Sequence, residues 1–249
     1  MKVRNNQIGF SQRVRLEWLE RTANLVLAGN DEAFIYSTLQ ELLEDKLSVG
    51  GNAKRGNREK VITILMKIWV RPPDKLHPLQ RKGLELLTRL PREYHIAVHW
   101  GMAMAVYPFW GAVAAHVGRL LRLQGTAAAS QVQRRVREQY GERDTVSRAT
   151  RRILRSFVDW GVLKETSNKG IYISGLSRTI AQEELVAWLA EAFLHAQQSN
   201  SVALREILDA TCLFPFRLRL ISADHLVTVS GRLDTLRHGL DQDLIMLLQ

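Results

Sequence analysis

Apolar residues recur at intervals of three and four through most of the chain, which is the spacing of amphipathic helices. In the first part, residues 1–107, this spacing predicts helices over 12–28, 31–47, 58–71, 76–90 and 92–106. Gly29 ends the first helix, Asn30 or Asp31 caps the second, and prolines separate the later ones. The sequence therefore predicts an N-terminal helical bundle.

The second part, residues 108–176, combines helical spacing with two short extended stretches. Helices are expected over 109–124, 129–140 and 145–160, and strands over 164–166 and 171–173 around a hairpin turn at 167–170. Gly141 ends the second of these helices, and Asp144 or Thr145 caps the third. Two helices joined by a short glycine turn and followed by a small hairpin make a winged helix-turn-helix.

The third part, residues 177–249, starts with amphipathic helices and ends with alternating segments. We expect helices over 178–198, 201–210 and 231–238, and strands over 216–221, 226–229 and 243–248. The strands would form a small two- or three-stranded sheet, so this part is a small α/β cap. The predicted fold class of the whole chain is mainly α.

The helix expected over 145–160 has two chemically different faces. Its apolar stripe contains Val146, Ala149, Ile153, Phe157 and Trp160. Another face carries Ser147, Arg148, Arg151, Arg152 and Arg155. One side can pack on a core while the other presents guanidinium groups, as in a helix that enters the DNA major groove.

Positive charge is concentrated around this helix. The chain has a net charge of +10, but residues 126–178 alone carry 11 basic and 5 acidic side chains, a net of +6. Residues 1–125 carry 19 and 11, whereas residues 179–249 carry 5 and 9, a net of −4. This concentration favours a polyanionic partner, and arginine suits both phosphate and the guanine edge.

These patterns predict double-stranded DNA as the partner and assign a set of candidate contacts. The candidate DNA-binding residues are Arg134, Arg135, Thr145, Ser147, Arg148, Thr150, Arg151, Arg152, Arg155 and Lys169. Lys54 and Arg55 lie in a glycine-rich loop that lacks the Gly-Lys-Ser/Thr ending of a nucleotide-binding loop. We expect these two residues to make auxiliary phosphate contacts only.

Residues 94–118 contain no Asp, Glu, Lys or Arg, a composition that also occurs in membrane spans. The run contains three histidines and is broken by Pro108, so we predict two buried helices, 92–106 and 109–124, and no membrane partner. Cys212 is the single cysteine, which excludes an internal disulfide, and the first residues lack a signal-peptide pattern. We therefore expect a cytoplasmic protein.

The sequence offers little for catalysis or metal binding. His95 and His99 are four residues apart, but no metalloprotease glutamate lies between them, so buried histidines are the better interpretation. The six tryptophans lie in helical apolar patterns, which favours core packing. With no nucleophile elbow and no dinucleotide fingerprint, we expect neither enzyme activity nor a cofactor.

Residues 145–173 resemble the winged-helix domains of GntR-type bacterial regulators. In that family a Ser-Arg-x-Thr-x-Arg-Arg helix leads to a Gly-Leu-Leu turn and a wing with glycine near its tip. The matching residues are Ser147, Arg148, Thr150, Arg151, Arg152, Gly161, Leu163 and Gly170. This chain is one residue shorter inside the helix, so base-reading positions do not carry over individually.

The whole layout is similar to the BrxA family, accessory proteins of bacterial BREX phage-defence systems. The similarity lies in the arginine-containing N-terminal helices, the central segment from Arg148 to Leu163, and the tail segments 213–218 and 237–243. It implies an N-terminal domain like that of the antitermination factor NusB, binding to double-stranded DNA, and other defence-system proteins as partners.

Three functions fit the sequence. The first is a non-enzymatic DNA-binding component of a BREX-type anti-phage system. The second is a winged-helix transcriptional regulator, which would protect a discrete palindromic operator. The third is an assembly module whose winged helix docks on a protein, with its arginines simply solvated.

Overall fold

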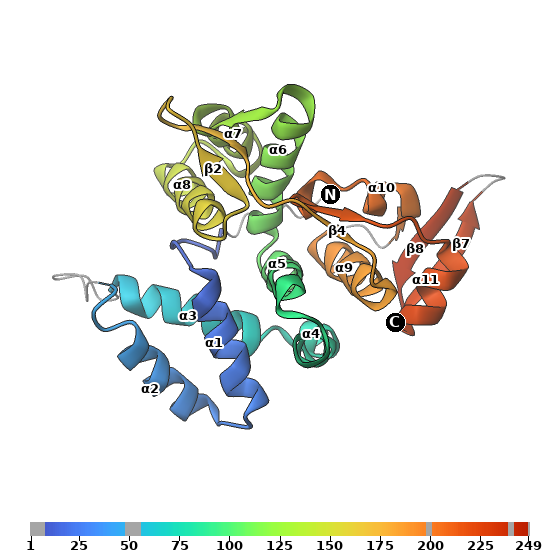
Figure 1. Ribbon diagram of the computed structural model, residues 1–249, viewed down its shortest axis with the longest axis horizontal. Helices are drawn as coiled ribbons and strands as arrows, with labels where there is room; N and C mark the ends of the chain where they lie inside the picture. The colour runs from blue at the N-terminus through green and yellow to red at the C-terminus, as the bar shows by residue number, and fades with distance from the viewer. Residues whose placement is uncertain (1–7, 48–55, 198–200, 239–241, 249) are drawn as a thin grey trace.

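The computed structural model describes residues 8–47, 56–197, 201–238 and 242–248 and is mainly helical, with three small sheets (Figure 1). The first part forms α1 (Leu16–Leu27), α2 (Glu32–Leu42), α3 (Asn57–Trp69), α4 (His77–Arg89) and α5 (His95–Val106). Single 3-10 turns, Asp74–Leu76 and Arg92–Tyr94, precede α4 and α5. All five predicted helices are present, but α1 begins four residues later than expected and α2 ends five residues earlier. Asp31 caps α2 by accepting from the Phe34 amide at 2.8 Å.

Helix α5 is the centre of the molecule, with every residue from Ile96 to Val106 buried. It ends at Val106, two residues before Pro108, where α6 (Pro108–Gln124) begins, so the predicted break is confirmed. No single helix in the described ranges is long and apolar enough to cross a membrane. The segments Arg92–Val106 and Pro108–Gln124 pass that test only as a pair, and they are bent by 119°.

The middle part forms α6, β1 (Thr126–Ala128), α7 (Ala129–Tyr140), α8 (Asp144–Asp159), β2 (Leu163–Glu165) and β3 (Ile171–Ser174). Its three strands make an antiparallel sheet in the order β1-β3-β2. The predicted helices and hairpin strands are all present, and Gly141 ends α7. β1 was not predicted, because three small residues carry no alternating pattern. The predicted cap of α8 was wrong, because the N-cap is Arg143 and no side chain caps this end.

The C-terminal part forms β4 (Arg178–Ile180), α9 (Glu183–Ala196), β5 (Ser201–Ala203), α10 (Leu204–Leu208) and β6 (Phe216–Leu218). It continues through α11 (Ala223–Ser230), β7 (Leu233–His238) and β8 (Gln242–Leu247), with a 3-10 turn at Thr211–Leu213. β4 pairs with β6 in parallel, and β5, β8 and β7 form a three-stranded antiparallel sheet. A small C-terminal sheet is therefore present, but of the three strands expected to form it only 243–248 takes part, as β8, because residues 216–218 pair with β4 instead.

Several C-terminal elements differ from the prediction. Residues 226–229, expected as a strand, lie in α11, because Ser222 caps that helix and Gly231 ends it. Residues 231–238 were expected as a helix, but residues 233–238 form β7, which pairs along its whole length with β8. Likewise, short strands replace the first residues of the helices expected over 178–198 and 201–210.

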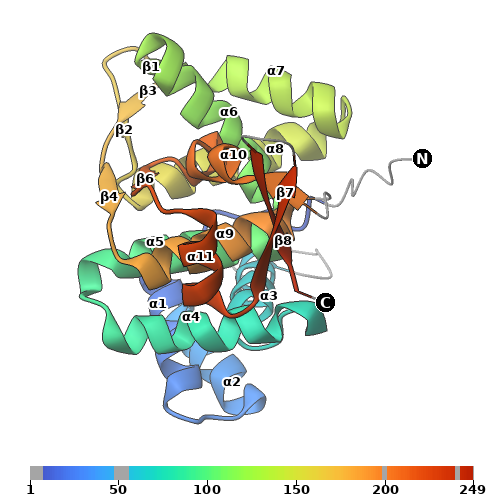
Figure 2. The ribbon, with the colours of Figure 1, turned by 90° about the vertical axis from the view of Figure 1, so that its right-hand side faces the viewer.

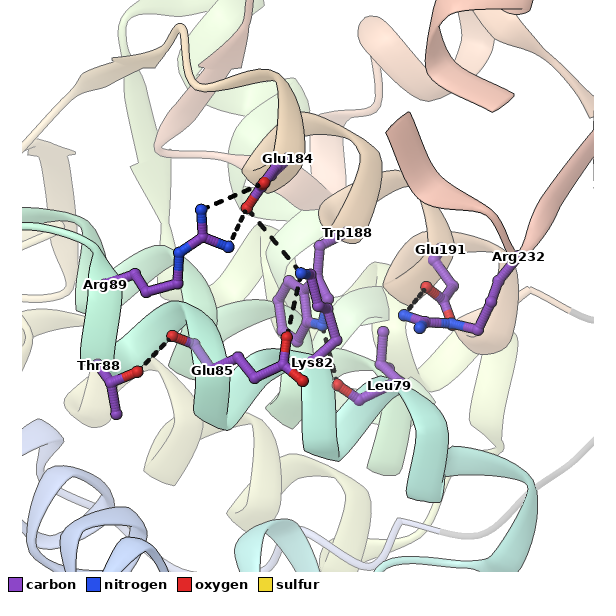
Figure 3. Close-up of polar contacts among 9 residues, drawn as sticks. All are labelled: Leu79, Lys82, Glu85, Thr88, Arg89, Glu184, Trp188, Glu191 and Arg232. Carbon is purple, nitrogen blue, oxygen red and sulfur yellow. Dashed lines mark hydrogen bonds and ion pairs between the residues drawn. The ribbon is translucent and has the colours of Figure 1, made fainter. Parts of the chain in front are cut away.

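Helix α9 joins this C-terminal part to the bundle by packing along α5 and α4 (Figure 2). The Trp188 indole donates to the carbonyl of Leu79 at 2.9 Å. A Cβ atom on Gly101 of α5 would lie 2.4 Å from the Trp188 ring, so only glycine permits this approach. Arg89 and Glu184 add an exposed ion pair of 3.1 Å between α4 and α9 (Figure 3).

An aromatic cluster occupies the place where the three parts of the chain meet. Trp100 of α5 packs on Trp110 of α6 and on Phe157 of α8, with ring centroids 5.3 and 4.8 Å apart. Phe214 and Phe216 approach Trp100 from the C-terminal part, each at 5.8 Å. All six tryptophans are at most 5% exposed, which confirms their prediction as core residues.

Candidate nucleic-acid interface

Helix α8 is buried along one face and exposed along the other, as its sequence pattern predicts. Val146, Ala149, Ile153 and Phe157 are fully or nearly fully buried. Arg148, Arg151 and Arg155 are exposed and lie at intervals of three and four, so they share one face of the helix. We call these three side chains the arginine row.

The first two members of the arginine row have no protein partner. Across the described ranges, neither Arg148 nor Arg151 makes a hydrogen bond or an ion pair. Their charges are close enough to act on Arg152, whose pKa is lowered first by burial and then by both neighbours. Arg148 and Arg151 are therefore two exposed positive charges that no residue in the described ranges neutralises.

Arg155 is tied to the hairpin that follows the helix. Its guanidinium lies 2.6 Å from the Glu165 carboxylate of β2, and both side chains are about half exposed. This pair links the end of the arginine row to the β2–β3 hairpin. The predicted contact Lys169 lies exposed in the turn of that hairpin.

Two predicted DNA contacts on α8 do not reach its exposed face. Thr150 is fully buried, and its hydroxyl donates to the Val146 carbonyl at 2.9 Å. The prediction was wrong because the buried arc of α8 is wider than the apolar stripe and includes this polar residue. Arg152 is half-buried and donates to the backbone carbonyl of Ser11, so it points toward residues that precede α1.

The remaining candidates lie around this face or outside the described ranges. Thr145 is exposed and Ser147 is half-buried near the start of α8. On α7, Arg135 pairs with Glu138 at 3.0 Å, and Arg134 lies 3.9 Å from the same carboxylate. Lys54 and Arg55 fall outside the residues that the structure describes.

The structure also reveals participants that the sequence did not single out. Residues 8–15, here called the N-terminal segment, run across α8: the Val14 amide donates to Ser156 Oγ at 2.9 Å, and the Trp160 indole donates to the Val14 carbonyl at 3.0 Å. Arg13 makes a two-pronged ion pair with Asp159. No local signal predicts contacts between residues more than 140 positions apart.

Two further exposed basic residues lie near α8 but were not among the predicted DNA contacts. Arg143 lies at the start of α8, where it donates to the Tyr140 carbonyl at 3.1 Å, and Lys164 lies on β2. Both were counted in the charge of this region, so the charge pattern alone could have found them.

The histidine pair of α5 belongs to a separate, buried network. Nε2 of His99 and Nδ1 of His95 lie 2.7 and 2.9 Å from the two oxygens of Glu20 on α1. The Trp69 indole donates to Nδ1 of His99 at 3.1 Å, so the proton of the neutral ring is on Nε2 and is donated to Glu20. His99 is fully buried, as predicted, whereas the His95 side chain is 14% exposed. Within the described ranges, no group of three or more His, Cys, Asp or Glu could hold a metal ion.

This network predicts a loss of stability in acid. Burial lowers the pKa of His99 below 6.5, and the hydrogen bond from His99 lowers the pKa of Glu20 from 4.5 to about 2. Both pKa values are lower in the folded state than in the unfolded state, so both residues contribute to the free energy of unfolding at neutral pH. The contribution of His99 decreases as the pH drops below 6.5, and that of Glu20 decreases between pH 4.5 and pH 2. Urea unfolding across this range should show a steeper loss below pH 4.5 in the wild type than in Glu20→Gln. Equal slopes would contradict the assignment.

Comparison of the chain with models of known protein families, with curated proteins and with solved structures finds no significant match.

Proposed function

We propose that the region from α6 to β3 is a winged helix-turn-helix and that the chain binds double-stranded DNA through α8. The observation that carries this proposal is the arginine row, in which Arg148 and Arg151 are exposed and unpaired among the described residues. Exposed cationic side chains that the described residues leave unneutralised fit a polyanionic ligand.

The arrangement of elements supports DNA as that ligand. The order α6-β1-α7-α8-β2-β3, with strand order β1-β3-β2, places a hairpin directly after the cationic helix. The 16 residues of α8 are long enough to lie in the major groove, which admits one α-helix. Arg148 and Arg151 would face the bases and phosphates there, and Lys169 at the hairpin turn would contact the flanking backbone.

The test is the double variant Arg148→Ala/Arg151→Ala. We expect its affinity for a labelled duplex to fall at least about tenfold, because each arginine contact contributes about 1–3 kcal/mol. The slope of log affinity against log salt should decrease by about two, from about 0.9 per lost phosphate contact. Fluorescence anisotropy over a salt series measures both quantities.

A matched control is Arg21→Ala/Arg81→Ala, which removes two exposed arginines from α1 and α4. It lowers the net charge by the same amount but should leave the salt slope unchanged. Equal behaviour of the two double variants would mean that α8 is not the DNA surface. Salt-independent binding by the wild type would exclude phosphate contacts altogether.

The similarity to BrxA-family proteins extends this proposal to a biological role. We infer a non-enzymatic, cytoplasmic component of a BREX-type anti-phage system, which acts with other defence proteins on DNA. In its native host, deletion of the gene should raise phage plaque formation. The wild-type gene should restore protection, and the Arg148→Ala/Arg151→Ala gene should not.

A further inference from the structure

The N-terminal segment contacts the second half of α8 at four places. Arg13 pairs with Asp159, the Val14 backbone bonds to Ser156 and Trp160, and the Ser11 carbonyl accepts from Arg152. These partners occupy successive turns of α8, so the segment follows the helix. Such an array fixes the rotation of a helix about its own axis as well as its position.

The same segment is anchored in the core at its other end. Phe10 is fully buried and packs on Tyr107 and Trp110, with ring centroids 5.4 and 4.8 Å apart. Gly9 has a φ of 57°, and a Cβ atom on it would lie 2.7 Å from the Tyr107 ring. Beyond Arg15 the chain enters α1, so the segment connects the helical bundle to α8 (Figure 1).

Asp159 is an unfavourable residue for the last turn of a helix, because the helix dipole places partial negative charge there. It also puts negative charge on the helix that carries the arginine row. Its two-pronged pair with Arg13 offsets both effects and ties down the segment. Contact with DNA would not explain why the Arg13–Asp159 ion pair is present.

We propose that the N-terminal segment, held by Arg152 and Asp159, is a clamp that positions α8 for DNA, and that Arg152 itself is not a DNA contact. This inference rests on the proposed function. The arginine row contacts DNA, whereas Arg152 and Asp159 act through the orientation of α8.

The variant Asp159→Asn distinguishes two explanations, because they predict opposite changes in DNA affinity. Removing a negative charge from α8 should raise DNA affinity if long-range electrostatics alone matters. Loosening the clamp should lower it, because only the fraction of molecules with α8 in place binds. We expect the dissociation constant to rise at least about threefold, with an unchanged salt slope because the bound state is the same.

A matched control and a second variant distinguish residues that position α8 from residues that contact DNA. Glu138→Gln removes an acidic partner of Arg134 and Arg135, with no role in the clamp, and should raise affinity. Arg152→Ala should lower affinity without changing the salt slope, whereas loss of a phosphate contact reduces the slope by about 0.9. Hydrogen exchange of the Val14 amide should be faster in both clamp variants, and a bound duplex should slow it in the wild type.

Three outcomes would overturn the clamp: unchanged or higher affinity in Asp159→Asn, a reduced salt slope in Arg152→Ala, or Val14 exchange that does not respond to the duplex. These results are distinct from failure of the proposed function. If Arg148→Ala/Arg151→Ala binds DNA like the wild type, the DNA surface itself is wrong. If that variant loses binding while Asp159→Asn does not, only the clamp is wrong.

Discussion

Replacement of Trp100 by alanine is expected to lower the free energy of unfolding by about 3–5 kcal/mol, the range for a fully buried large aromatic side chain. Trp100 is 0% exposed, and its ring contacts aromatic rings from α6, α8 and the C-terminal part. Its indole also donates to the carbonyl of Cys212 at 2.9 Å. One truncation would therefore weaken packing in three parts of the chain at once.

Urea unfolding at neutral pH measures this effect, with Trp100→Phe as the graded control. The phenylalanine keeps most of the ring packing but leaves the Cys212 carbonyl without its donor, which costs about 1–3 kcal/mol. The alanine variant should therefore be clearly less stable than the phenylalanine variant. A loss below about 1 kcal/mol in Trp100→Ala would mean that the cluster is not the shared core of the three parts.

Much of the helical framework follows from local pattern. The breaks at Pro91 and Pro108, the cap at Asp31 and the end of α7 at Gly141 were all predicted, because proline, cap residues and glycine act within one turn of their own position. The separation of buried and exposed faces on α8 has the same origin. Side chains three and four residues apart must share a face.

Local pattern failed where strand pairing and helix capping decide the outcome. The run Leu226-Val227-Thr228-Val229 favours a strand, yet its caps and its packing on α9 make it a helix. The next residues become β7 only because β8 is there to pair with them. A strand that is stabilised mainly by pairing with its neighbour leaves little trace in its own sequence.

The candidate site divides along the same line. The exposure of Arg148 and Arg151 could be predicted from helical spacing. The fate of Arg152 could not, because its partner Ser11 lies 141 residues away in the sequence. Thr150 shows a different limit, since a hydroxyl can be buried when it bonds to its own helix backbone.

The second large effect is expected at the ion pair between the buried Glu191 of α9 and Arg232, which directly precedes β7. The Glu191 side chain is 3% exposed, and its carboxylate accepts two bonds from Arg232, at 2.7 and 2.9 Å (Figure 3). Among the described residues, Arg232→Met would leave the buried carboxylate with the His195 ring, 3.8 Å away, as its one remaining ion-pair partner, and that ring is charged only when protonated. Breaking a buried pair on one side costs about 3–5 kcal/mol.

The neighbouring pair between Arg89 and Glu184 is a natural control. Its side chains are 60% and 43% exposed, so Arg89→Met should cost less than about 1 kcal/mol. The double variant Glu191→Gln/Arg232→Met should recover much of the loss, because it removes the buried charge itself. Similar costs for Arg232→Met and Arg89→Met would show that burial of Glu191 has no energetic consequence.

The pH dependence of stability provides a second, independent test of this prediction. Burial alone raises the pKa of Glu191, but the hydrogen bonds from His195 and Arg232 outweigh it and lower the pKa below 4.5. The wild type therefore loses this contribution as the pH falls below 4.5. In Arg232→Met, burial of Glu191 outweighs its remaining hydrogen bond, so the pKa of Glu191 in the folded state rises. As the pH falls, Glu191 becomes protonated and the variant no longer holds an unpaired buried charge. The stability gap between the two proteins should narrow on acidification, and a gap that stays constant or widens would mean that Arg232 does not hold Glu191 in its charged form.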